Sequence, residues 1–455
     1  MVQDKHPEKE RSKLNTTARG GIGVQRLMDH ATPARFLGSH EATASPPLLL
    51  LPLAPRRSPS ATLLHRQLPP PRPELGMSVI IPAKNEAAKL PATLAALAAQ
   101  TDLVGRPLPP GSFEVIVLAN NCTDATAAVA RQQAQLLPNL VVHVAEIRLP
   151  AAKAHVGRAR RLLMDEAAAR LEAVGCRAGI IASTDADTRV APHWLAAIQA
   201  EILAGADAVG GRIFTEMSGP ALLPLRRIQV RDAAYRLLCA RLEGLLDPNQ
   251  MDPWPRHHQH FGASLALTVR AYRRVGGLPE VRFLEDEALC QALLRHDLAV
   301  RHSPTVQVLT SARRQGRVEV GLSWQLREWL LLSRQQREPL VDSPAQLATL
   351  WQLRRQLRAY WGGHLGRQHK VLAARLRLPA PVLLSKVRRS ATFGQLWAWA
   401  LKRGQSASVA QVPLSQALLA LPRLIQHYDS NENSEVENVN VSLASQAGSS
   451  RAGAR

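Results

Sequence analysis

The sequence has few cysteines and lacks long apolar runs. Its four cysteines are each more than fifty residues apart, a spacing that forms no disulfide or zinc pattern and fits a reducing cytoplasm. They are Cys122, Cys176, Cys239 and Cys290. The longest apolar runs, 47–55 and 416–421, fall far short of the roughly twenty residues that a membrane-spanning helix requires. We therefore expect a cytoplasmic protein, with peripheral contact to the inner face of a membrane left open.

Aromatic residues are also scarce, at 4% of the chain, whereas basic residues outnumber acidic ones by 57 to 36 and give a formal net charge of +21. Such a charge makes nucleic acid a partner to consider. Few aromatic side chains leave few platforms on which single-stranded bases could stack, and no zinc-finger, RRM or KH pattern occurs. The sequence therefore predicts no nucleic-acid partner.

Short apolar runs alternate with amphipathic segments from residue 77 onward. Strands are predicted at 78–82, 113–119, 140–145 and 178–182. Helices are predicted between them, at about 88–100, around 128–136 and in the basic stretch from 153. Because strand–helix alternation builds parallel sheets covered on both faces, we predict an α/β fold with a doubly wound, mainly parallel sheet.

Two acidic residues follow the last of these strands. Asp185-Ala186-Asp187 leaves its carboxyl end, which is the edge where open α/β sheets bind ligands. Mg²⁺ and Mn²⁺ favour oxygen ligands and bridge to substrate phosphates, so the pair suits a divalent cation. Aspartate also ends strands for turn reasons alone, and the triplet by itself leaves both interpretations open.

Four short motifs occur in order between residues 77 and 317. They are Val79-Ile80-Ile81-Pro82-Ala83-Lys84-Asn85-Glu86, Asn120-Asn121-Cys122-Thr123-Asp124-Ala125-Thr126, Asp185-Ala186-Asp187 and Leu284-Glu285-Asp286-Glu287. Together they resemble the family 2 glycosyltransferases, which have the GT-A fold and use nucleotide-diphosphate sugars. The resemblance implies a GT-A glycosyltransferase domain over 77–318.

The first two motifs resemble the family's donor site. The backbone of Pro82 and Ala83 would then border the nucleoside, and Glu86 would accept hydrogen bonds from the ribose. The family carries an aspartate, which accepts from uracil, where Asn120 or Asn121 stands here, and we select Asn120. Because an asparagine amide both donates and accepts, the nucleobase stays open.

A basic segment follows the third predicted strand, where the resemblance expects residues that skirt the sugar and diphosphate. Guanidinium groups bind phosphate in bidentate fashion. Lys153, Arg158, Arg160 and Arg161 cannot all face a ligand from one helix, and we select Arg160 for donor binding. A second basic segment, 310–317, resembles a loop that closes over the diphosphate, or it simply ends the domain.

The resemblance assigns the metal to Asp187, with Asp185 as a ribose or metal partner and His302 as a further metal ligand. A bound Mg²⁺ or Mn²⁺ would neutralise the β-phosphate as the nucleoside diphosphate leaves. The family's general base lies at an acidic pair that matches Glu285-Asp286, and we select Asp286 with Glu285 in reserve. A helix N-terminus also favours such acids for structural reasons alone.

Three nearby histidines, His257, His258 and His260, invite comparison with a zinc site. No cysteine or acid nearby completes a tetrahedral ligand set. We therefore expect them to line the acceptor or donor cleft.

The segment 319–428 differs in composition from the α/β region. Between 320 and 403, fifteen Lys or Arg stand against three Asp or Glu, a net charge of +12, and apolar residues recur at helical spacing. We predict a basic helical appendage. Trp and Leu opposite Arg suit a helix on an anionic membrane surface. They also suit helices packed on the catalytic domain with a solvated basic face, and both interpretations stay open.

Both ends of the chain lack sustained periodicity. Residues 1–76 are rich in Pro, Arg, Ser and Ala, and 429–455 in Ser, Asn, Glu and Gly, so we predict disorder in both. Met77 directly precedes the first strand, and we expect translation to begin there. An intact mass of the native protein that includes residues 1–76 would contradict this expectation.

Taken together, the sequence predicts a metal-dependent glycosyltransferase that moves a sugar from a nucleotide-diphosphate donor to a hydroxyl acceptor, with inversion by family analogy. The acceptor, whether a glycan, a lipid-linked carrier or a small molecule, has no readable signal. Two alternatives stay open: a non-catalytic module that binds nucleotide or glycan, and a sugar-phosphate nucleotidyltransferase. The latter usually carries a Gly-rich loop after the first strand, whereas residues 82–86 contain no glycine.

Overall fold

The computed structural model describes residues 64–176, 178–217, 222–313, 321–363, 369–403 and 409–430. The predicted disorder of 1–76 and 429–455 therefore lies largely outside the described residues. Residues 64–76, which the sequence assigned to the N-terminal extension, pack on the α/β region. Leu64, Leu68 and Leu75 are buried in its core, and the carbonyl of Pro69 accepts a hydrogen bond of 2.7 Å from Arg170 Nη1.

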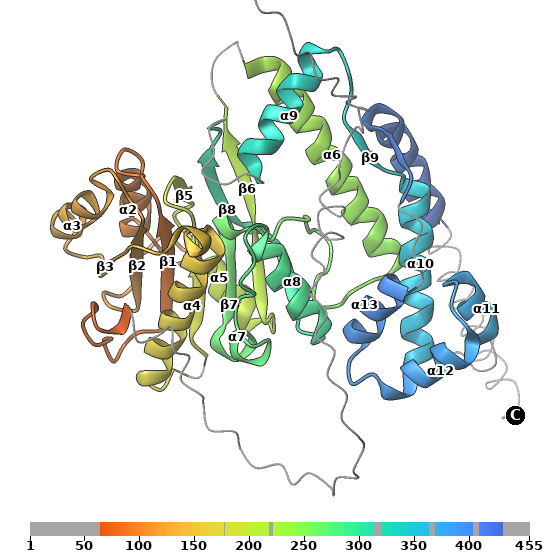
Figure 1. Ribbon diagram of the computed structural model, residues 1–455, viewed down its shortest axis with the longest axis horizontal. Helices are drawn as coiled ribbons and strands as arrows, with labels where there is room; N and C mark the ends of the chain where they lie inside the picture. The colour runs from red at the N-terminus through yellow and green to blue at the C-terminus, as the bar shows by residue number, and fades with distance from the viewer. Residues whose placement is uncertain are drawn as a thin grey trace, which may run out of the picture.

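The described strands form one eight-stranded sheet in the order β3-β2-β1-β4-β7-β6-β8-β5, beside a small two-stranded sheet (Figure 1). Their bounds are β1 Met77–Ala83, β2 Phe113–Asn120, β3 Val142–Ile147, β4 Ile180–Ser183, β5 Thr188–Val190, β6 Ala208–Glu216, β7 Leu265–Thr268 and β8 Val300–Ser311. β1 pairs in parallel with β2 and β4, as do β2 with β3 and β6 with β8. β7 runs antiparallel to β4 and β6, and β5 to β8. The predicted α/β class with a mainly parallel sheet is confirmed.

Helices cover both faces of this sheet, as predicted. Their bounds are α2 Leu90–Ala98, α3 Thr126–Leu136, α4 Val156–Ala173, α5 Trp194–Leu203, α7 Val269–Arg274 and α8 Glu285–Arg295. Ile80 of β1 packs on the face that α4 and α8 cover, whereas its neighbour Val79 packs on the face with Leu94 of α2 and Trp194 of α5. Because side chains alternate across a strand, the continuous apolar run of β1 fills both cores.

A helical region lies beside the sheet, at the right in Figure 1. Its elements are α6 Leu223–Leu246, α9 Leu322–Arg334, β9 Leu340–Asp342, α10 Pro344–Trp361, α11 His369–Arg375, α12 Ala380–Arg389, α13 Phe393–Arg403 and β10 Gln411–Pro413, and residues 414–430 are also helical. α6 follows β6 in the chain and so connects this region to the sheet. Within the region, Tyr235 and Leu242 of α6 pack with Trp351 of α10 and with Leu414.

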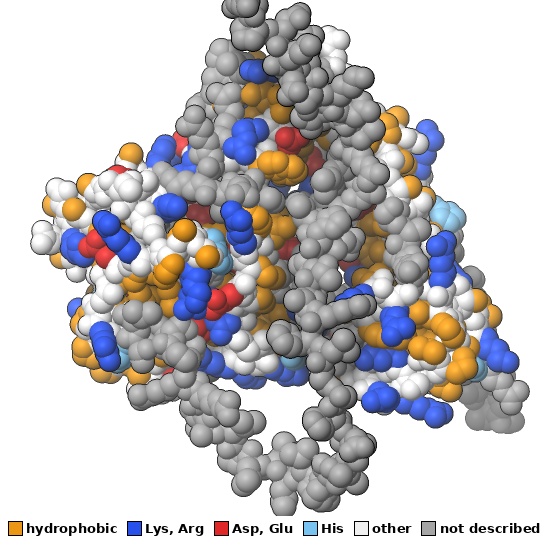
Figure 2. Space-filling model, viewed as in Figure 1, with side chains coloured by type: hydrophobic (Ala, Val, Ile, Leu, Met, Phe, Trp, Pro, Cys, Tyr) orange, Lys and Arg blue, Asp and Glu red, His pale blue; other side chains and the backbone are white. Residues whose placement is uncertain are grey.

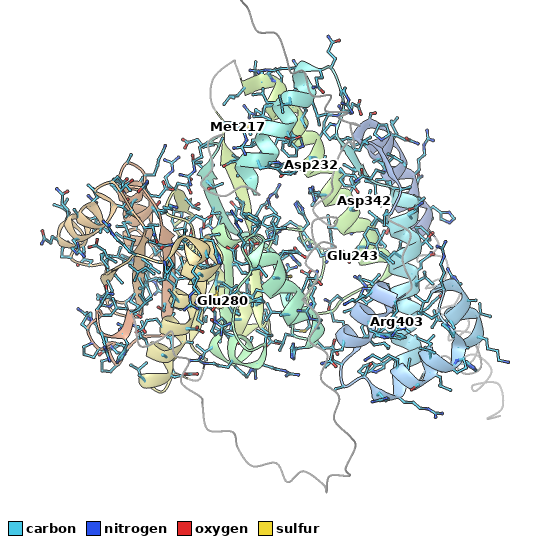
Figure 3. The ribbon with its side chains drawn as sticks, viewed as in Figure 1. Met217, Asp232, Glu243, Glu280, Asp342 and Arg403 are labelled. Carbon is cyan, nitrogen blue, oxygen red and sulfur yellow. The ribbon has the colours of Figure 1, made fainter. Side chains whose placement is uncertain are left out.

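Ion pairs reinforce the contact between α6 and α10. Asp247, whose side chain is fully buried, pairs with both Arg354 and Arg358, and Arg354 also reaches Glu243 at 2.7 Å. Figure 3 shows Asp232 and Glu243 along α6, the latter on the stretch beside α10.

The predicted basic helical appendage is confirmed. Its apolar residues pack within the region and on α6, which supports the interpretation of packed helices, and membrane contact stays a prediction. Lys and Arg side chains are scattered over the described part of the face shown in Figure 2. Among the described residues, no helix has the length and apolar character needed to cross a membrane.

Candidate active site

A cleft of about 500 Å³ lies at the carboxyl ends of β1, β2 and β4. α6 and α9 contribute lining residues from the helical region, and the first turn of α8 lines it as well. Nearly all of the residues selected from the sequence line this cleft: Pro82, Ala83, Glu86, Asn120, Arg160, Asp185, Asp187, Glu285 and Asp286. The remaining one, His302, is not among the lining residues.

Two asparagines shape the turns after β1 and β2. Asn85 and Asn121 have φ angles of 54° and 50°, a left-handed conformation that asparagine tolerates better than most residues. Asn85 Oδ1 accepts from the Thr123 amide at 2.7 Å, which joins the two turns. Asn121 bonds through its side chain to the amide and carbonyl of Leu149, both at 2.9 Å. The side chain of Asn121 therefore holds the turn in place through these hydrogen bonds.

Asn120, by contrast, lines the cleft. It is 4% exposed, and within the described part of the chain its Oδ1 has no hydrogen-bond partner. A buried carbonyl oxygen without a donor costs about 1–3 kcal/mol. The position therefore suits a ligand that donates an N–H or O–H group to Oδ1.

The buried side chain of Arg160 bonds residues of two acidic motifs. Its Nε donates to Glu285 Oε1 at 3.1 Å and its Nη2 to Asp185 Oδ1 at 3.0 Å, while Nη1 bonds Ser183 Oγ and, at 2.8 Å, the Gly262 carbonyl. Burial disfavours the charged guanidinium, but Asp185 and Glu285 outweigh it and hold the pKa of Arg160 above its ordinary value. Within the protein Arg160 supports these carboxylates, and its contact with donor phosphate stays a prediction.

Asp185 and Asp187 both face the cleft. Burial, together with the charge of Asp185, raises the pKa of Asp187, so a cation between the two would relieve their repulsion. Their oxygens fit Mg²⁺ or Mn²⁺, which take few protein carboxylates and share substrate phosphates. No group of three or more His, Cys, Asp or Glu within the described ranges is arranged to hold a metal ion by itself.

Arg313, in the predicted closing segment, lies over this acidic site. One of its nitrogens bonds Glu86 Oε1 and another lies 3.4 Å from Asp187 Oδ2. The segment therefore reaches the cleft through Arg313. Residues 314–317 of that prediction lie outside the described residues.

The acidic pair of the last motif opens α8. Leu284, with φ 57°, precedes the helix and Glu285 is its first residue. Burial raises the pKa of Glu285 to about 7, with Asp286 adding to the rise and Arg160 opposing it. Asp286 lines the cleft, and its two oxygens accept from the amides of Gly262 at 2.7 Å and Glu287 at 2.8 Å. Asp286 is thus held in one orientation at the cleft wall.

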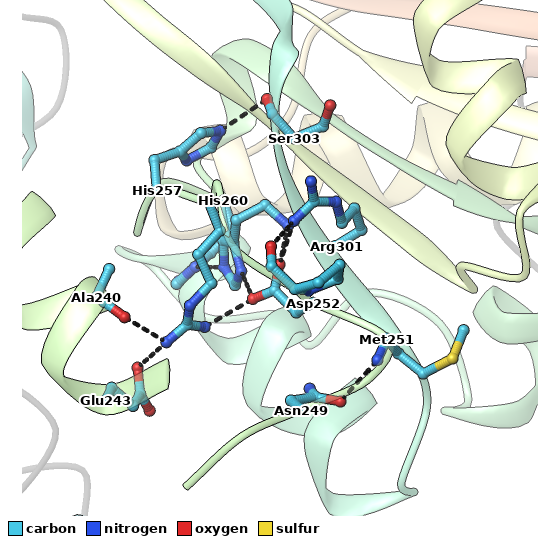
Figure 4. A network of polar contacts seen from close by, with 12 residues as sticks. Ala240, Glu243, Asn249, Met251, Asp252, His257, His260, Arg301 and Ser303 are labelled. Carbon is cyan, nitrogen blue, oxygen red and sulfur yellow. Dashed lines mark hydrogen bonds and ion pairs between the residues drawn. The ribbon is translucent and has the colours of Figure 1, made fainter. Parts of the chain in front are cut away.

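The histidines separate into different environments. His258 lines the cleft, and burial holds its pKa well below the ordinary value. His257 bonds the Ser303 carbonyl at 2.9 Å, as Figure 4 shows. His302 lies on β8 with Nδ1 2.8 Å from Asp252 Oδ2 and Nε2 3.3 Å from His260 Nδ1. In these contacts His302 belongs to a polar network beside the cleft, and its role as a metal ligand stays a prediction.

The wall that α6 and α9 form was not predicted from the sequence. It consists of Gln229, Asp232, Ala233 and Arg236 of α6 and Leu322, Ser323, Trp324, Gln325 and Trp329 of α9. Asp232 accepts from Arg236 at 2.7 Å. These residues are far from the motifs in sequence, and the apolar spacing of α9 was the only available signal.

Residues 78–265 match the family model described as glycosyl transferase family 2. No curated protein matches the chain. A solved mannosyltransferase from Pyrobaculum calidifontis, in complex with GDP-Man and Mn²⁺, is 18% identical, with 77% of this chain and 95% of that chain covered and a TM-score of 0.38. TarS residues 1–349 of S. aureus with UDP-GlcNAc is 14% identical, with 72% and 92% covered and a TM-score of 0.38. Glucosyl-3-phosphoglycerate synthase of M. tuberculosis is 18% identical, with 59% and 85% covered and a TM-score of 0.32.

Proposed function

Through residues 78–265 the chain belongs to glycosyl transferase family 2, and we propose that it transfers a sugar from a nucleoside-diphosphate donor to a hydroxyl acceptor in this cleft. One observation carries the proposal. The turns after β1, β2 and β4 and the first turn of α8, far apart in sequence, bring Asn120, Asp185, Asp187 and Asp286 to a single cavity.

The donor would bind along the turns of the sheet. Asn120 Oδ1 would accept an N–H from the nucleobase, which supplies the partner that the described residues lack. Glu86, beside the same cleft, would accept from ribose hydroxyls once Arg313 turns away from it. Arg313 could then bond diphosphate oxygens with its guanidinium fork.

Asp187 and Asp185 would hold Mg²⁺ or Mn²⁺, which supplies charge neutralisation for the departing diphosphate. Arg160 fixes Asp185 through a hydrogen bond of 3.0 Å. The carboxylate of Asp185 is therefore held in place before ligand arrives, and such preorganisation favours electrostatic stabilisation of a leaving group.

Asp286 would act as the general base. It lines the cleft with its carboxylate oriented by two backbone amides, and it would take the proton of the acceptor hydroxyl as that oxygen attacks the anomeric carbon. Attack opposite the diphosphate gives inversion. Glu285 is less suited because it is 4% exposed and pairs with Arg160.

The acceptor would approach along the wall of α6 and α9. Trp324 and Leu322 offer apolar surface there, and Gln229 and Asp232 offer polar groups. A glycan, a lipid-linked carrier and a small molecule each fit this mixture of groups, so the acceptor class is left to experiment.

Calorimetry of donor binding tests the proposal. UDP-, GDP- and dTDP-sugars are titrated with and without Mn²⁺ into wild type, Asp187→Ala and the loop control Asp102→Ala. We expect metal-dependent binding of one nucleotide class that is lost only in Asp187→Ala, and Asp286→Asn to bind donor but transfer no sugar. Absence of donor binding with metal refutes the donor site. Binding without transfer by the wild type favours a non-catalytic module. Formation of a nucleotide sugar and pyrophosphate from a nucleoside triphosphate and a sugar 1-phosphate favours a nucleotidyltransferase.

A further inference from the structure

We propose that the partly buried ion pair between His260 and Glu287 is a positioning device that holds Asp286 in its catalytic orientation. The inference rests on the proposed function, in which Asp286 is the general base. His260 Nε2 bonds Glu287 Oε2, and the two side chains are 15% and 14% exposed. Neither residue is among those that line the cleft, so any influence on transfer passes through their neighbours.

The pair joins the two backbone segments that donate hydrogen bonds to Asp286. His260 lies two residues before Gly262, whose amide bonds Asp286 Oδ2 at 2.7 Å. Glu287 follows Asp286 directly, and its own amide bonds Asp286 Oδ1 at 2.8 Å. One ion pair therefore fixes the distance between the two donors, and through them the plane of the carboxylate.

Both members of the pair are themselves held by further contacts. Gln291, one turn along α8, donates to Glu287 Oε1 at 2.9 Å. His302 lies 3.3 Å from His260 Nδ1 and continues to Asp252, which also bonds Arg256 at 2.7 Å. Figure 4 shows this network around Asp252 and His260. Arg256 in turn donates to Glu243 of α6 at 2.6 Å. Because the network is thus anchored in α8, β8 and α6, rotation of either side chain breaks several contacts at once.

The loop that carries Gly262 has little freedom on its other side. The position where a Cβ would stand at residue 262 is 2.4 Å from the guanidinium of Arg160, so the backbone lies directly against that side chain. Arg160 Nη1 in turn donates to the Gly262 carbonyl. The loop is thus held between Arg160 and the His260–Glu287 pair, with its amide directed at Asp286.

Loss of the pair should slow the chemical step and leave donor binding intact. A displacement of the base by about 1 Å can cost on the order of 100-fold in rate. We therefore expect Glu287→Ala to lower kcat by roughly 10- to 100-fold with the donor Kd within about twofold of wild type, because it leaves the donor-site residues untouched. Glu287→Gln keeps the side-chain volume and one hydrogen bond, so its kcat should lie between those of the wild type and of Glu287→Ala.

Amide exchange provides a measurement that does not depend on activity. Hydrogen–deuterium exchange at the amides of Gly262 and Glu287 should be faster in Glu287→Ala, Glu287→Gln and His260→Gln than in wild type. Glu114→Gln is the control. It weakens a buried ion pair with Arg170 near the amino end of β2, the end away from the cleft, and should alter neither these amides nor kcat per folded molecule.

Folded Glu287→Gln and His260→Gln proteins with wild-type kcat and unchanged exchange at both amides would overturn the inference. If the wild type transfers no sugar, the proposed function fails, while exchange at the two amides still reports on whether the pair holds them. Should Glu287→Ala fail to fold, the two conservative variants alone decide.

Discussion

Arg160→Met is the substitution whose consequences the structure defines most fully. It keeps the length of the side chain but removes the charge that lies between Asp185 and Glu285. Ser183 Oγ also loses the hydrogen bond from Arg160, and the Gly262 carbonyl keeps only the one from Ser183 Oγ at 3.0 Å. Because removal of one partner leaves buried charge uncompensated, we expect a loss of about 3–5 kcal/mol in the free energy of unfolding.

The loss should depend on pH in a defined direction. Burial already raises the pKa of Glu285 to about 7 in the folded wild type, and removal of the guanidinium raises it further. A carboxyl group whose pKa is raised by folding binds more protons in the folded state than in the unfolded state. The free energy of unfolding therefore falls as the pH rises from the ordinary pKa of the group through its pKa in the folded protein. Arg160→Met should therefore be destabilised less at pH 5 than at pH 8.

Urea unfolding at pH 5 and pH 8, followed by tryptophan fluorescence to which the buried Trp194 contributes, measures both quantities. Arg189→Met is the control, because Arg189 pairs with Glu216 at the surface and exposed pairs contribute about 0–1 kcal/mol. A loss no larger than that of the control, or a larger loss at pH 5 than at pH 8, would refute the reasoning.

Two further predictions concern the parts of the chain outside the motifs. Leu64 is fully buried, so Leu64→Ala should lower the free energy of unfolding in urea by about 2–5 kcal/mol. The control Leu103→Ala, at a 62% exposed position, should change this free energy little. Equal effects would mean that residues 64–76 do not belong to the core. Asp247→Ala removes the buried carboxylate that pairs with both Arg354 and Arg358, while Glu243 still pairs with Arg354. The loss should lie near the lower end of about 3–5 kcal/mol, against a small effect for Asp429→Ala in the more exposed pair with Arg241. A loss below about 1 kcal/mol for Asp247→Ala would show that the ion pairs of Asp247 contribute little to the contact between α6 and α10.

The sheet was predictable because its signals are local. β1 and β2 are uninterrupted apolar runs, and such runs alternating with helices specify a parallel sheet. The order of the four motifs then indicated which sheet edge would carry the site. The antiparallel β7 was not predictable in this way, because its four residues, Leu265–Thr268, acquire their direction only from pairing with β4 and β6.

Asn120 and Asn121 illustrate what the local sequence does not predict, namely which of two neighbouring side chains faces the cleft. The sequence offered both as candidates and did not distinguish between them. Leu149 decides this by accepting from and donating to the amide of Asn121. The basic segment presents the same problem: helical geometry says that only some of its residues turn inward, and the carboxylates of Asp185 and Glu285 decide that Arg160 is among those that do.

The sequence by itself therefore determined the strand–helix order, the fold class and the acidic residues at the sheet edge, because apolar periodicity and short motifs act over a few residues. Only the tertiary structure decided that α6 and α9 complete the cleft, that Arg160 lies buried between two carboxylates, and that His302 lies against Asp252. Those outcomes depend on which charged and apolar groups from distant parts of the sequence come into contact when the chain folds. A local sequence pattern does not predict such long-range contacts.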